Sequence, residues 1–285
     1  MNAFLNWWQH LPGKMNPVIF ELGPLKPQYY GLMYIIAFAV TYALVRYRIK
    51  REAAFDIEPE KMADLATAMI LGLIVGARLG YVLFYNLPYY ARHPLEIFLP
   101  FEFTDGVRFI GFSGMSYHGG LIGVILSAWL YIRRAGLDFC EMVDLFVPVI
   151  PLGYTFGRLG NFINGELFGR ETTAMIGMYF PTAPGVALRH PSQLYEAFFE
   201  GIFLFVVLWN LRKGCRVKGA MLAYYLFGYG TVRFVIEYFR QPDAHLGFVL
   251  LSFSLGQLLC IAMLVAGILL YLWLGRIDAN RQRAV

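Results

Sequence analysis

Long apolar stretches separated by short polar segments fill most of the chain between residues 29 and 274. Each stretch is long enough for a helix that crosses a lipid bilayer, which takes about 17–25 residues. Seven stretches can be drawn, at Tyr29–Val45, Met62–Tyr85, Met115–Ile132, Glu141–Gly157, Gln193–Leu211, Gly219–Glu237 and Phe248–Leu274. The pattern predicts an all-α fold, a polytopic integral membrane protein with seven transmembrane helices.

The fourth stretch contains residues that interrupt helices. Pro148 and Pro151 lie in its middle, and Gly153, Gly157 and Gly160 follow. Proline removes a backbone donor and clashes with the preceding turn. The polar groups that this frees are tolerated in a membrane only where protein or a wet cavity satisfies them. We therefore expect this helix to be kinked or broken.

Composition supports the membrane interpretation and narrows the possible partners. Of the 285 residues, 58% are hydrophobic and 15% are charged, whereas a soluble domain carries about 25% charged residues. The net charge of +5 does not indicate nucleic-acid binding, because the basic residues are concentrated between the apolar stretches. Cys140, Cys215 and Cys260 are far apart and match no metal-binding or disulfide spacing. We expect no metal site, no cofactor and no nucleic-acid partner.

The distribution of Lys and Arg predicts the orientation of the chain. If the N-terminus lies outside, the inner loops hold about twice as many basic residues as the outer loops, as the positive-inside rule requires. We therefore predict a periplasmic N-terminus and a cytoplasmic C-terminus. The chain would form one catalytic domain, 1–285, with a short periplasmic segment at about 161–191 between the fourth and fifth helices.

Polar residues gather toward the outer ends of the predicted helices. They are Tyr30, Arg78, His118, Arg158, Asn161, Asn164, Glu166, Arg233 and Glu237. An arginine near the bilayer centre costs about 2.5–3.5 kcal/mol on insertion scales, so such residues indicate a functional site. Each could instead be structural, with Arg233 paired to Glu237 or Arg158 reaching the interface, and His118 alone is more often a satisfied buried histidine. Their convergence at one depth favours a shared site, although for Arg78 we favour a structural role.

The residue types at this depth suit a phosphorylated ligand. Tyr229, Arg233 and Glu237 are spaced at i, i+4 and i+8 and share one helical face. Guanidinium groups bind phosphate through paired hydrogen bonds, and a histidine is a proton acceptor near neutral pH. Gly119 and Gly120, directly after the histidine, would let backbone and lipid come close together. The residues predict chemistry on a phospholipid headgroup at the outer face, without naming the acceptor.

Five motifs give the chain a family resemblance. They read YYGLMY at 29–34, HGGLIG at 118–123, GRLGNFINGELFGR at 157–170, RHPSQLYE at 189–196 and GYGTVRFVIEYFRQPD at 228–243. In this order they resemble bacterial prolipoprotein diacylglyceryl transferases, over nearly the whole chain from about Asn16 to Gly275. The block at 157–170 is the most specific of them. One departure is Glu171–Leu188, which is short, whereas some members carry a larger extramembrane insertion there.

The resemblance implies an activity, its partners and its place. A member of this family transfers the diacylglyceryl group of phosphatidylglycerol to the lipobox cysteine in the signal peptide of a prolipoprotein. The products are a thioether-linked protein and glycerol 1-phosphate, and the site faces the outer leaflet of the bacterial inner membrane. By motif, His118 corresponds to the family's essential histidine, Arg158 to its phosphatidylglycerol-binding arginine and Arg233 to a second essential arginine. Further matches to residues important for activity or lipid placement are Tyr30, Asn161, Glu166, Tyr229 and Glu237.

The corresponding mechanism is a hypothesis about charge and protons. The nucleophile is the thiolate of the substrate cysteine. Arg158 and Arg233 would stabilise the negative charge that develops on the leaving phosphate. Glu237 would orient Arg233. His118 would either take the thiol proton or orient the headgroup. Asn161 and Glu166 would position headgroup hydroxyls.

Two other membrane functions stay open at this point. An acyltransferase that uses an activated fatty acyl donor would form an ester or amide and would release no glycerol phosphate. A phospholipid transporter would distribute polar residues through the depth of the membrane, whereas here the inner halves of the predicted helices are nearly free of charge. This asymmetry favours an enzyme.

Overall fold

The computed structural model is mostly helical and describes residues 3–23, 26–97, 99, 101–102, 108–109, 114–241, 248–250 and 253–283. Two compact units can be recognised, and each is described by itself. The first comprises Met1–Glu52 and Val143–Val285, and the second comprises Ala53–Met142.

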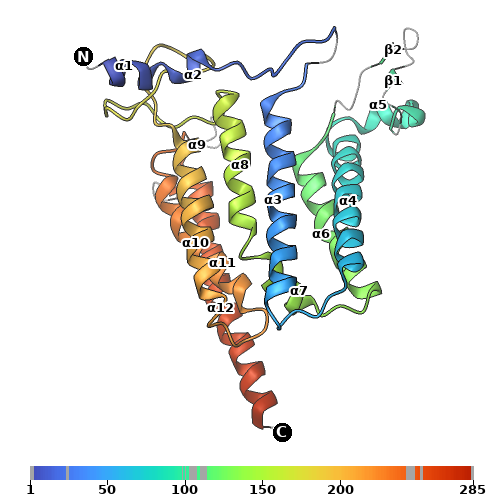
Figure 1. Ribbon diagram of the computed structural model, residues 1–285. Helices are drawn as coiled ribbons and strands as arrows, with labels where there is room; N and C mark the ends of the chain where they lie inside the picture. Colours follow the sequence, from blue (N-terminus) through green and yellow to red (C-terminus); the bar gives the residue numbers. More distant parts are fainter. Residues whose placement is uncertain are drawn as a thin grey trace. The chain divides into compact units, whose positions relative to one another are not determined.

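The first unit is a bundle of long helices with a short helical segment at its N-terminus (Figure 1). Its elements are α1 (Ala3–Gln9), α2 (Leu11–Lys14), α3 (Tyr29–Arg51), the second half of α7 (Phe139–Phe146), α8 (Ile150–Ile163), α9 (Ser192–Tyr195), η2 (Glu196–Phe203), α10 (Leu204–Leu211), α11 (Ala220–Ile236), β3 (Phe248–Leu250), β4 (Phe253–Ser254) and α12 (Leu255–Arg283). Helix α8 packs against both α3 and η2, and α11 packs along α12. The helix that carries Arg158 therefore lies in the middle of this unit.

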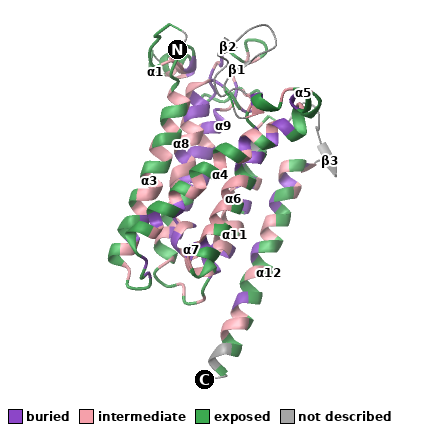
Figure 2. Cartoon of the chain, turned by 90° about the vertical axis from the view of Figure 1, so that its right-hand side faces the viewer, coloured by how far each residue is buried: buried purple, intermediate pink, exposed green. Residues whose placement is uncertain are grey.

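Several helices have the length and composition of membrane spans. Within the part of the chain that the structure describes, four are long and apolar enough by themselves, namely α3, α4 (Pro59–Tyr85), the continuous helix at Ser192–Leu211, and α12 over Leu255–Asn280. Helices α7 and α8 together form a fifth, bent by 50°. Many residues of these helices are exposed, as the green segments of α3 and α12 in Figure 2 show, and many of the exposed residues are large and hydrophobic. The chain is a multi-pass membrane protein, and the prediction of a broken fourth helix is confirmed.

The break between α7 and α8 coincides with the two prolines of the fourth stretch. Residues 147–149 separate the helices, and Pro151 occupies the first turn of α8, where a missing N–H is harmless. Arg48, buried near the end of α3, donates from Nη1 to the carbonyls of Asp144 (2.7 Å) and Leu145 (2.5 Å). The carbonyl groups released at the end of α7 are thus satisfied by a side chain from another helix.

Glu52, directly after α3, stabilises the region around the break between α7 and α8. Its carboxylate pairs with Arg48 at 2.8 Å and with Arg212 at 2.9 Å. Burial alone would raise the pKa of Glu52, but the hydrogen bonds and charges of the two arginines outweigh it and hold that pKa below its usual value. Asp144 contributes to the same region by accepting from the backbone N–H of Gly219 at 2.6 Å and of Met221 at 3.1 Å, at the start of α11.

Element η2 is a π-helix of eight residues between α9 and α10. π-Helical segments are rare and occur frequently at functional sites. Thr155 of α8 donates its hydroxyl to the carbonyl of Ala197 at 3.2 Å, and the missing side chain of Gly201 leaves room for the same threonine. The backbones of α8 and η2 therefore approach each other closely. The first residue of the π-helix is Glu196.

The segment after α8 is held in place by the N-terminal helices. The indole of Trp8 donates to the carbonyl of Ile176 at 3.0 Å, and the N–H of Tyr179 donates to the carbonyl of Gln9 at 2.8 Å. Beneath them a small core forms around Phe162, Met178 and Phe180, with Trp8, Leu11 and Met15 packed against it. Isolated β-bridges join Gly169 to Arg240 and join Arg189 to both Glu171 and Met178. The segment predicted to lie outside the membrane therefore has a fixed path.

The second unit is built on two helices in backbone contact. Its elements are α4, α5 (Leu87–Arg92), η1 (Pro94–Ile97), β1 (Phe101–Glu102), β2 (Arg108–Phe109) and α6 (Tyr117–Arg134). Helices α4 and α6 meet through glycines: a Cβ on Gly76 would collide with the carbonyl oxygen of Gly119, and one on Gly80 would lie 2.7 Å from the Cα of Gly119. Gly72 and Gly123 make the same kind of contact further along. Close approach of this kind is typical of helix pairs in membranes.

The predicted boundaries and the observed ones differ mainly at the ends. Each of the seven stretches contains a helix, but the last begins at Leu255, because residues 248–250 and 253–254 pair as an antiparallel ladder instead. Helix α11 has 17 residues and is apolar, at the lower end of the length of a span. Seven spans and the orientation of the termini stay predictions.

Candidate active site

Two arginines from different helices meet at one carboxylate oxygen. Arg158 of α8 and Arg233 of α11 approach Glu196 Oε2, at 2.9 Å from Nε of the first and 3.2 Å from Nη1 of the second. Glu196 is fully buried, Arg233 is nearly so, and the Arg158 side chain is 20% exposed. The predicted convergence of these two guanidinium groups is present in the structure, with an acidic side chain between them.

Arg233 has two further acidic partners. Nη1 lies 3.3 Å from Glu200 Oε1, and Nη2 lies 3.1 Å from Glu237 Oε2, one turn further along the chain. Glu237 also accepts a hydrogen bond of 3.0 Å from the hydroxyl of Ser254. The geometry agrees with the expectation that Glu237 orients Arg233.

Arg158 is held mainly by groups on its own helix. Its Nε donates to the hydroxyl of Tyr154 at 2.6 Å, its Nη1 donates to Asn161 Oδ1 at 3.3 Å, and its guanidinium carbon lies 4.7 Å from the centre of the Tyr154 ring. The Tyr154 hydroxyl in turn donates to Glu200 Oε2 at 2.5 Å. Tyr154 therefore connects the surroundings of both arginines.

The cluster combines acidic and basic groups in close contact. The guanidinium groups of Arg158 and Arg233 face three carboxylates, those of Glu196, Glu200 and Glu237, and Arg240 lies at the margin, 4.0 Å from Glu237. Removing one member of a buried ionic network leaves an uncompensated charge, which is strongly destabilising. Any anionic ligand at these arginines has to compete with acidic side chains that already occupy them.

The loop after α8 adds polar groups next to the cluster. Asn161 Nδ2 donates to Glu166 Oε1 at 2.9 Å, and Asn164 Nδ2 lies 3.4 Å from the same oxygen. The side chain of Gln193 donates to the Glu166 carbonyl at 2.6 Å. The sharp turn here needs positive φ at Gly165 (67°), where glycine is the residue of least strain. Asn161 and Glu166 thus form one hydrogen-bonded pair beside Arg158.

The two predicted tyrosines lie on either side of α8. Tyr229 of α11 meets the Tyr154 ring edge-on, with 6.2 Å between ring centres. Tyr30, at the start of α3, packs where Gly160 leaves space, and its hydroxyl lies 3.0 Å from that of Tyr34. Tyr229 therefore belongs to the arginine cluster, and Tyr30 lies along the neighbouring face of α8.

His118 and the two glycines after it belong to the second unit. His118 is the second residue of α6 and is exposed. Ser116 caps the helix by accepting from the N–H of Gly119 at 3.3 Å. Gly119 and Gly120 are buried against α4, so the space they leave is used by that helix. The structure therefore groups seven of the predicted site residues in the first unit and these three in the second.

Comparison with known proteins identifies the family. A sequence model of the prolipoprotein diacylglyceryl transferase family matches residues 17–273. The chain belongs to this family. Among its relatives, the phosphatidylglycerol–prolipoprotein diacylglyceryl transferase of Chlorobaculum tepidum is 55% identical over 285 residues, which is all of this chain and 96% of the relative. The proteins of the same name from Bordetella avium and Francisella tularensis subsp. mediasiatica are 45% and 43% identical, over 92% and 89% of this chain and 96% and 91% of their own.

Arg78 has a structural role in this member of the prolipoprotein diacylglyceryl transferase family. Its guanidinium donates to the carbonyls of Glu96 (2.5 Å), Ile97 (2.8 Å) and Gly114 (3.3 Å) and lies over the Tyr90 ring. It thereby connects the segments that flank β1 and β2 to α4. This agrees with the structural role that we favour for Arg78 from the sequence.

Sequence reasoning missed the two glutamates at the centre of the cluster. Glu196 and Glu200 lie in the apolar stretch Gln193–Leu211, and Glu196 also ends the motif at 189–196, but neither is among the predicted site residues. Two acidic residues spaced by four within an apolar stretch were a usable signal, because a charge in a membrane helix requires a partner. Tyr154 gave no comparable signal, since tyrosine is common in membrane helices.

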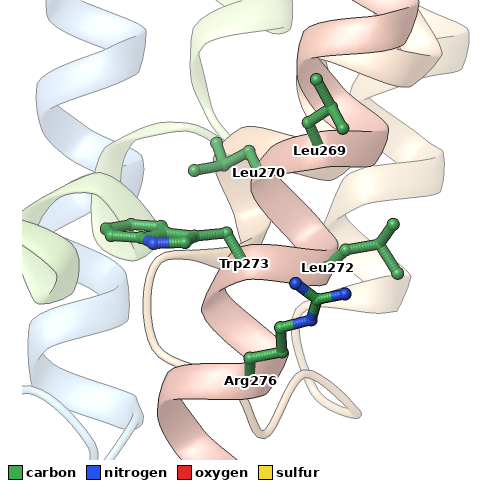
Figure 3. Close-up of a pocket in the computed structure, with 5 residues that line it drawn as sticks. All are labelled: Leu269, Leu270, Leu272, Trp273 and Arg276. Atoms are coloured by element: carbon green, nitrogen blue, oxygen red, sulfur yellow. The ribbon is translucent and has the colours of Figure 1, made fainter.

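A pocket elsewhere in this family member has a different character. It encloses about 460 Å³ along α12 and is lined by Leu269, Leu270, Leu272, Trp273 and Arg276 (Figure 3). All five residues come from one helix, and none belongs to the arginine cluster. Within the described ranges, no group of three His, Cys, Asp or Glu side chains is arranged to hold a metal ion. The arginine cluster is therefore the candidate active site.

Proposed function

We propose that the protein transfers the diacylglyceryl group of phosphatidylglycerol to the lipobox cysteine thiol of a prolipoprotein. The observation that carries this proposal is the convergence of Arg158 and Arg233 on one oxygen atom. Two guanidinium groups at that spacing can hold two oxygens of one phosphate. Two relatives whose names state this activity are 55% and 45% identical along the chain.

The reaction breaks one bond and forms one bond. The thiolate sulfur of the substrate attacks the glyceryl carbon that bears the phosphate, the carbon–oxygen bond breaks, and a thioether forms. The bonding electrons leave with the oxygen of glycerol 1-phosphate, whose charge therefore increases. Arg158 and Arg233 stabilise that charge in a site of low dielectric constant, where fixed donors act most strongly.

The remaining predicted residues position the reactants. Glu237 orients Arg233, and the Asn161–Glu166 pair contacts the hydroxyls of the headgroup. His118 is the proposed acceptor of the thiol proton, since its imidazole is basic near neutral pH. Tyr30 and Tyr229 contact the lipid beside α8.

The proposal includes a place for the enzyme. It crosses the bacterial inner membrane seven times as a single catalytic domain, with the N-terminus in the periplasm and the C-terminus in the cytoplasm. The arginine cluster then faces the outer leaflet. The apolar helices and the bent pair α7–α8 support a multi-pass arrangement, and the excess of Lys and Arg in the predicted inner loops supports the orientation.

The test is a reaction with purified protein, phosphatidylglycerol and a lipobox peptide. We expect a peptide whose mass has increased by one diacylglyceryl group, in step with the release of glycerol 1-phosphate, and no adduct on a Cys→Ser peptide. An acyl adduct without glycerol phosphate would replace the proposal by an acyltransferase. Lipid movement across the bilayer without any adduct would replace it by a transporter.

A further inference from the structure

Glu196 Oε2 contacts both guanidinium groups that are proposed to hold the substrate phosphate. Arg158 Nε lies 2.9 Å and Arg233 Nη1 lies 3.2 Å from it. Carboxylate and phosphate oxygens accept the same charge-assisted hydrogen bonds from guanidinium groups. The carboxylate and a headgroup phosphate therefore compete for the same donors.

Glu196 is held less firmly than its acidic neighbours. Its second oxygen, Oε1, is buried and has no hydrogen-bond partner among the residues that the structure describes. Glu237 also accepts a hydrogen bond of 3.0 Å from the Ser254 hydroxyl, and the Tyr154 hydroxyl lies closer to Glu200 Oε2 (2.5 Å) than to Glu196 Oε2 (3.3 Å). Of the three carboxylates, Glu196 depends most on the arginines themselves.

Both arginines keep other partners when Glu196 is displaced. Arg233 retains Glu200 and Glu237, and Arg158 retains Tyr154 and Asn161. Displacement of this one carboxylate therefore frees donors toward a ligand without releasing either guanidinium from its place.

We propose that Glu196 is an internal competitor of the phosphate. It pairs both arginines when the headgroup is absent, yields them to phosphatidylglycerol, and reclaims them from the glycerol phosphate product. This inference rests on the proposed function. Glu196 is a positioning residue, because it acts through the two arginines.

The charge of the product explains why such a competitor is needed. The phosphodiester of the lipid carries one negative charge, whereas a phosphate monoester carries about 1.5 to 2 at neutral pH. The product therefore binds two guanidinium groups more tightly than the substrate does. Product release limits the turnover of many enzymes, and a buried carboxylate that reclaims the same donors opposes product retention.

The decisive variant is Glu196→Gln, which keeps the shape and removes the charge. We expect the inhibition constant of glycerol 1-phosphate to fall by about tenfold or more, equivalent to about 1.4 kcal/mol, with KM for phosphatidylglycerol and kcat both reduced. Glu196→Asp, which keeps the charge on a shorter side chain, should restore part of kcat. The matched control is Glu200→Gln, which removes the same charge one turn further along but leaves Glu196 in place, and should shift the inhibition constant less than Glu196→Gln does.

A binding measurement keeps the test independent of turnover and of any loss of stability. The shift in Tm produced by glycerol 1-phosphate is measured for the native protein and for Glu196→Gln, both without peptide. Inorganic phosphate serves as a second probe. A larger shift for Glu196→Gln than for the native protein supports the proposal. An equal or smaller shift, or an unchanged inhibition constant, overturns it. If the native protein forms no adduct while the Tm result holds, the proposed function fails and the competition at the arginines stands.

Discussion

Replacing Arg158 by lysine separates the charge of this residue from its shape. The guanidinium has three polar contacts through two nitrogens: Nε with Glu196 at 2.9 Å and with Tyr154 at 2.6 Å, and Nη1 with Asn161 at 3.3 Å. A lysine has a single nitrogen at the end of a flexible chain. It can keep one of these contacts well.

The size of the effect follows from the hydrogen bonds that a lysine cannot make. Hydrogen bonds to charged groups contribute about 1.5–3 kcal/mol each, so the absence of two of them amounts to roughly 3 kcal/mol at the lower end. Each factor of ten in rate corresponds to about 1.4 kcal/mol. We therefore expect Arg158→Lys to lower kcat/KM by about 100-fold or more, measured as glycerol phosphate released from labelled phosphatidylglycerol.

The matched control is Arg240→Lys. Arg240 lies at the margin of the same cluster, 4.0 Å from Glu237, and its substitution should leave kcat/KM within about threefold of the native value, since an ion pair of that length contributes little. Tm measured for both variants separates an effect on chemistry from an effect on folding. Near-native activity of Arg158→Lys at limiting phosphatidylglycerol would refute the claim that the planar fork holds the phosphate.

Three further predictions concern the rest of the molecule. Gly76→Ala places a Cβ against the Gly119 carbonyl and should lower the free energy of unfolding by about 1–3 kcal/mol. The control Gly31→Ala, with nothing within 4 Å of the added Cβ, should be neutral or stabilising by up to about 1 kcal/mol. An equal Tm for the two variants would contradict the glycine contact. Glu52 has a lowered pKa, so the stability it contributes is present above its unfolded pKa near 4.5 and is lost as pH falls through the lower folded value. Glu52→Gln should therefore reduce Tm at pH 7 and flatten its decline in acid, and an unchanged acid profile would count against this role. If His118 takes the thiol proton, His118→Asn should abolish transfer at every pH; substantial activity in that variant would assign the histidine to headgroup orientation instead.

The sequence predicted the parts of the structure that depend on local chemistry. The break between α7 and α8 follows from Pro148 and Pro151, because proline cannot continue a helix after its first turn. The contact between Arg233 and Glu237 follows from helical spacing. Both features are properties of a few neighbouring residues and need no knowledge of packing.

The features that escaped prediction depend on contacts between distant segments. Glu196 is difficult to single out in the sequence because the average hydropathy of its stretch is high. Its contacts with Arg158 and Arg233 depend on how α8 and α11 pack beside it. The π-helix that begins there depends on how closely Thr155 and Gly201 allow two backbones to approach. The polar contacts of Tyr154 could not be inferred from its type or its position.

The glycine contact between α4 and α6 has a consequence for how the histidine reaches its depth. Helix α6 ends in two arginines and begins with His118 as its second residue, and it is not among the helices that qualify as spans by their own length and composition. Its backbone lies directly on that of α4, which is long and apolar enough to cross a membrane, so we expect α6 to enter the bilayer together with α4. The position of the His118 imidazole therefore depends on a neighbouring helix, and a larger side chain at Gly76, which contacts Gly119, would displace His118, the proposed proton acceptor.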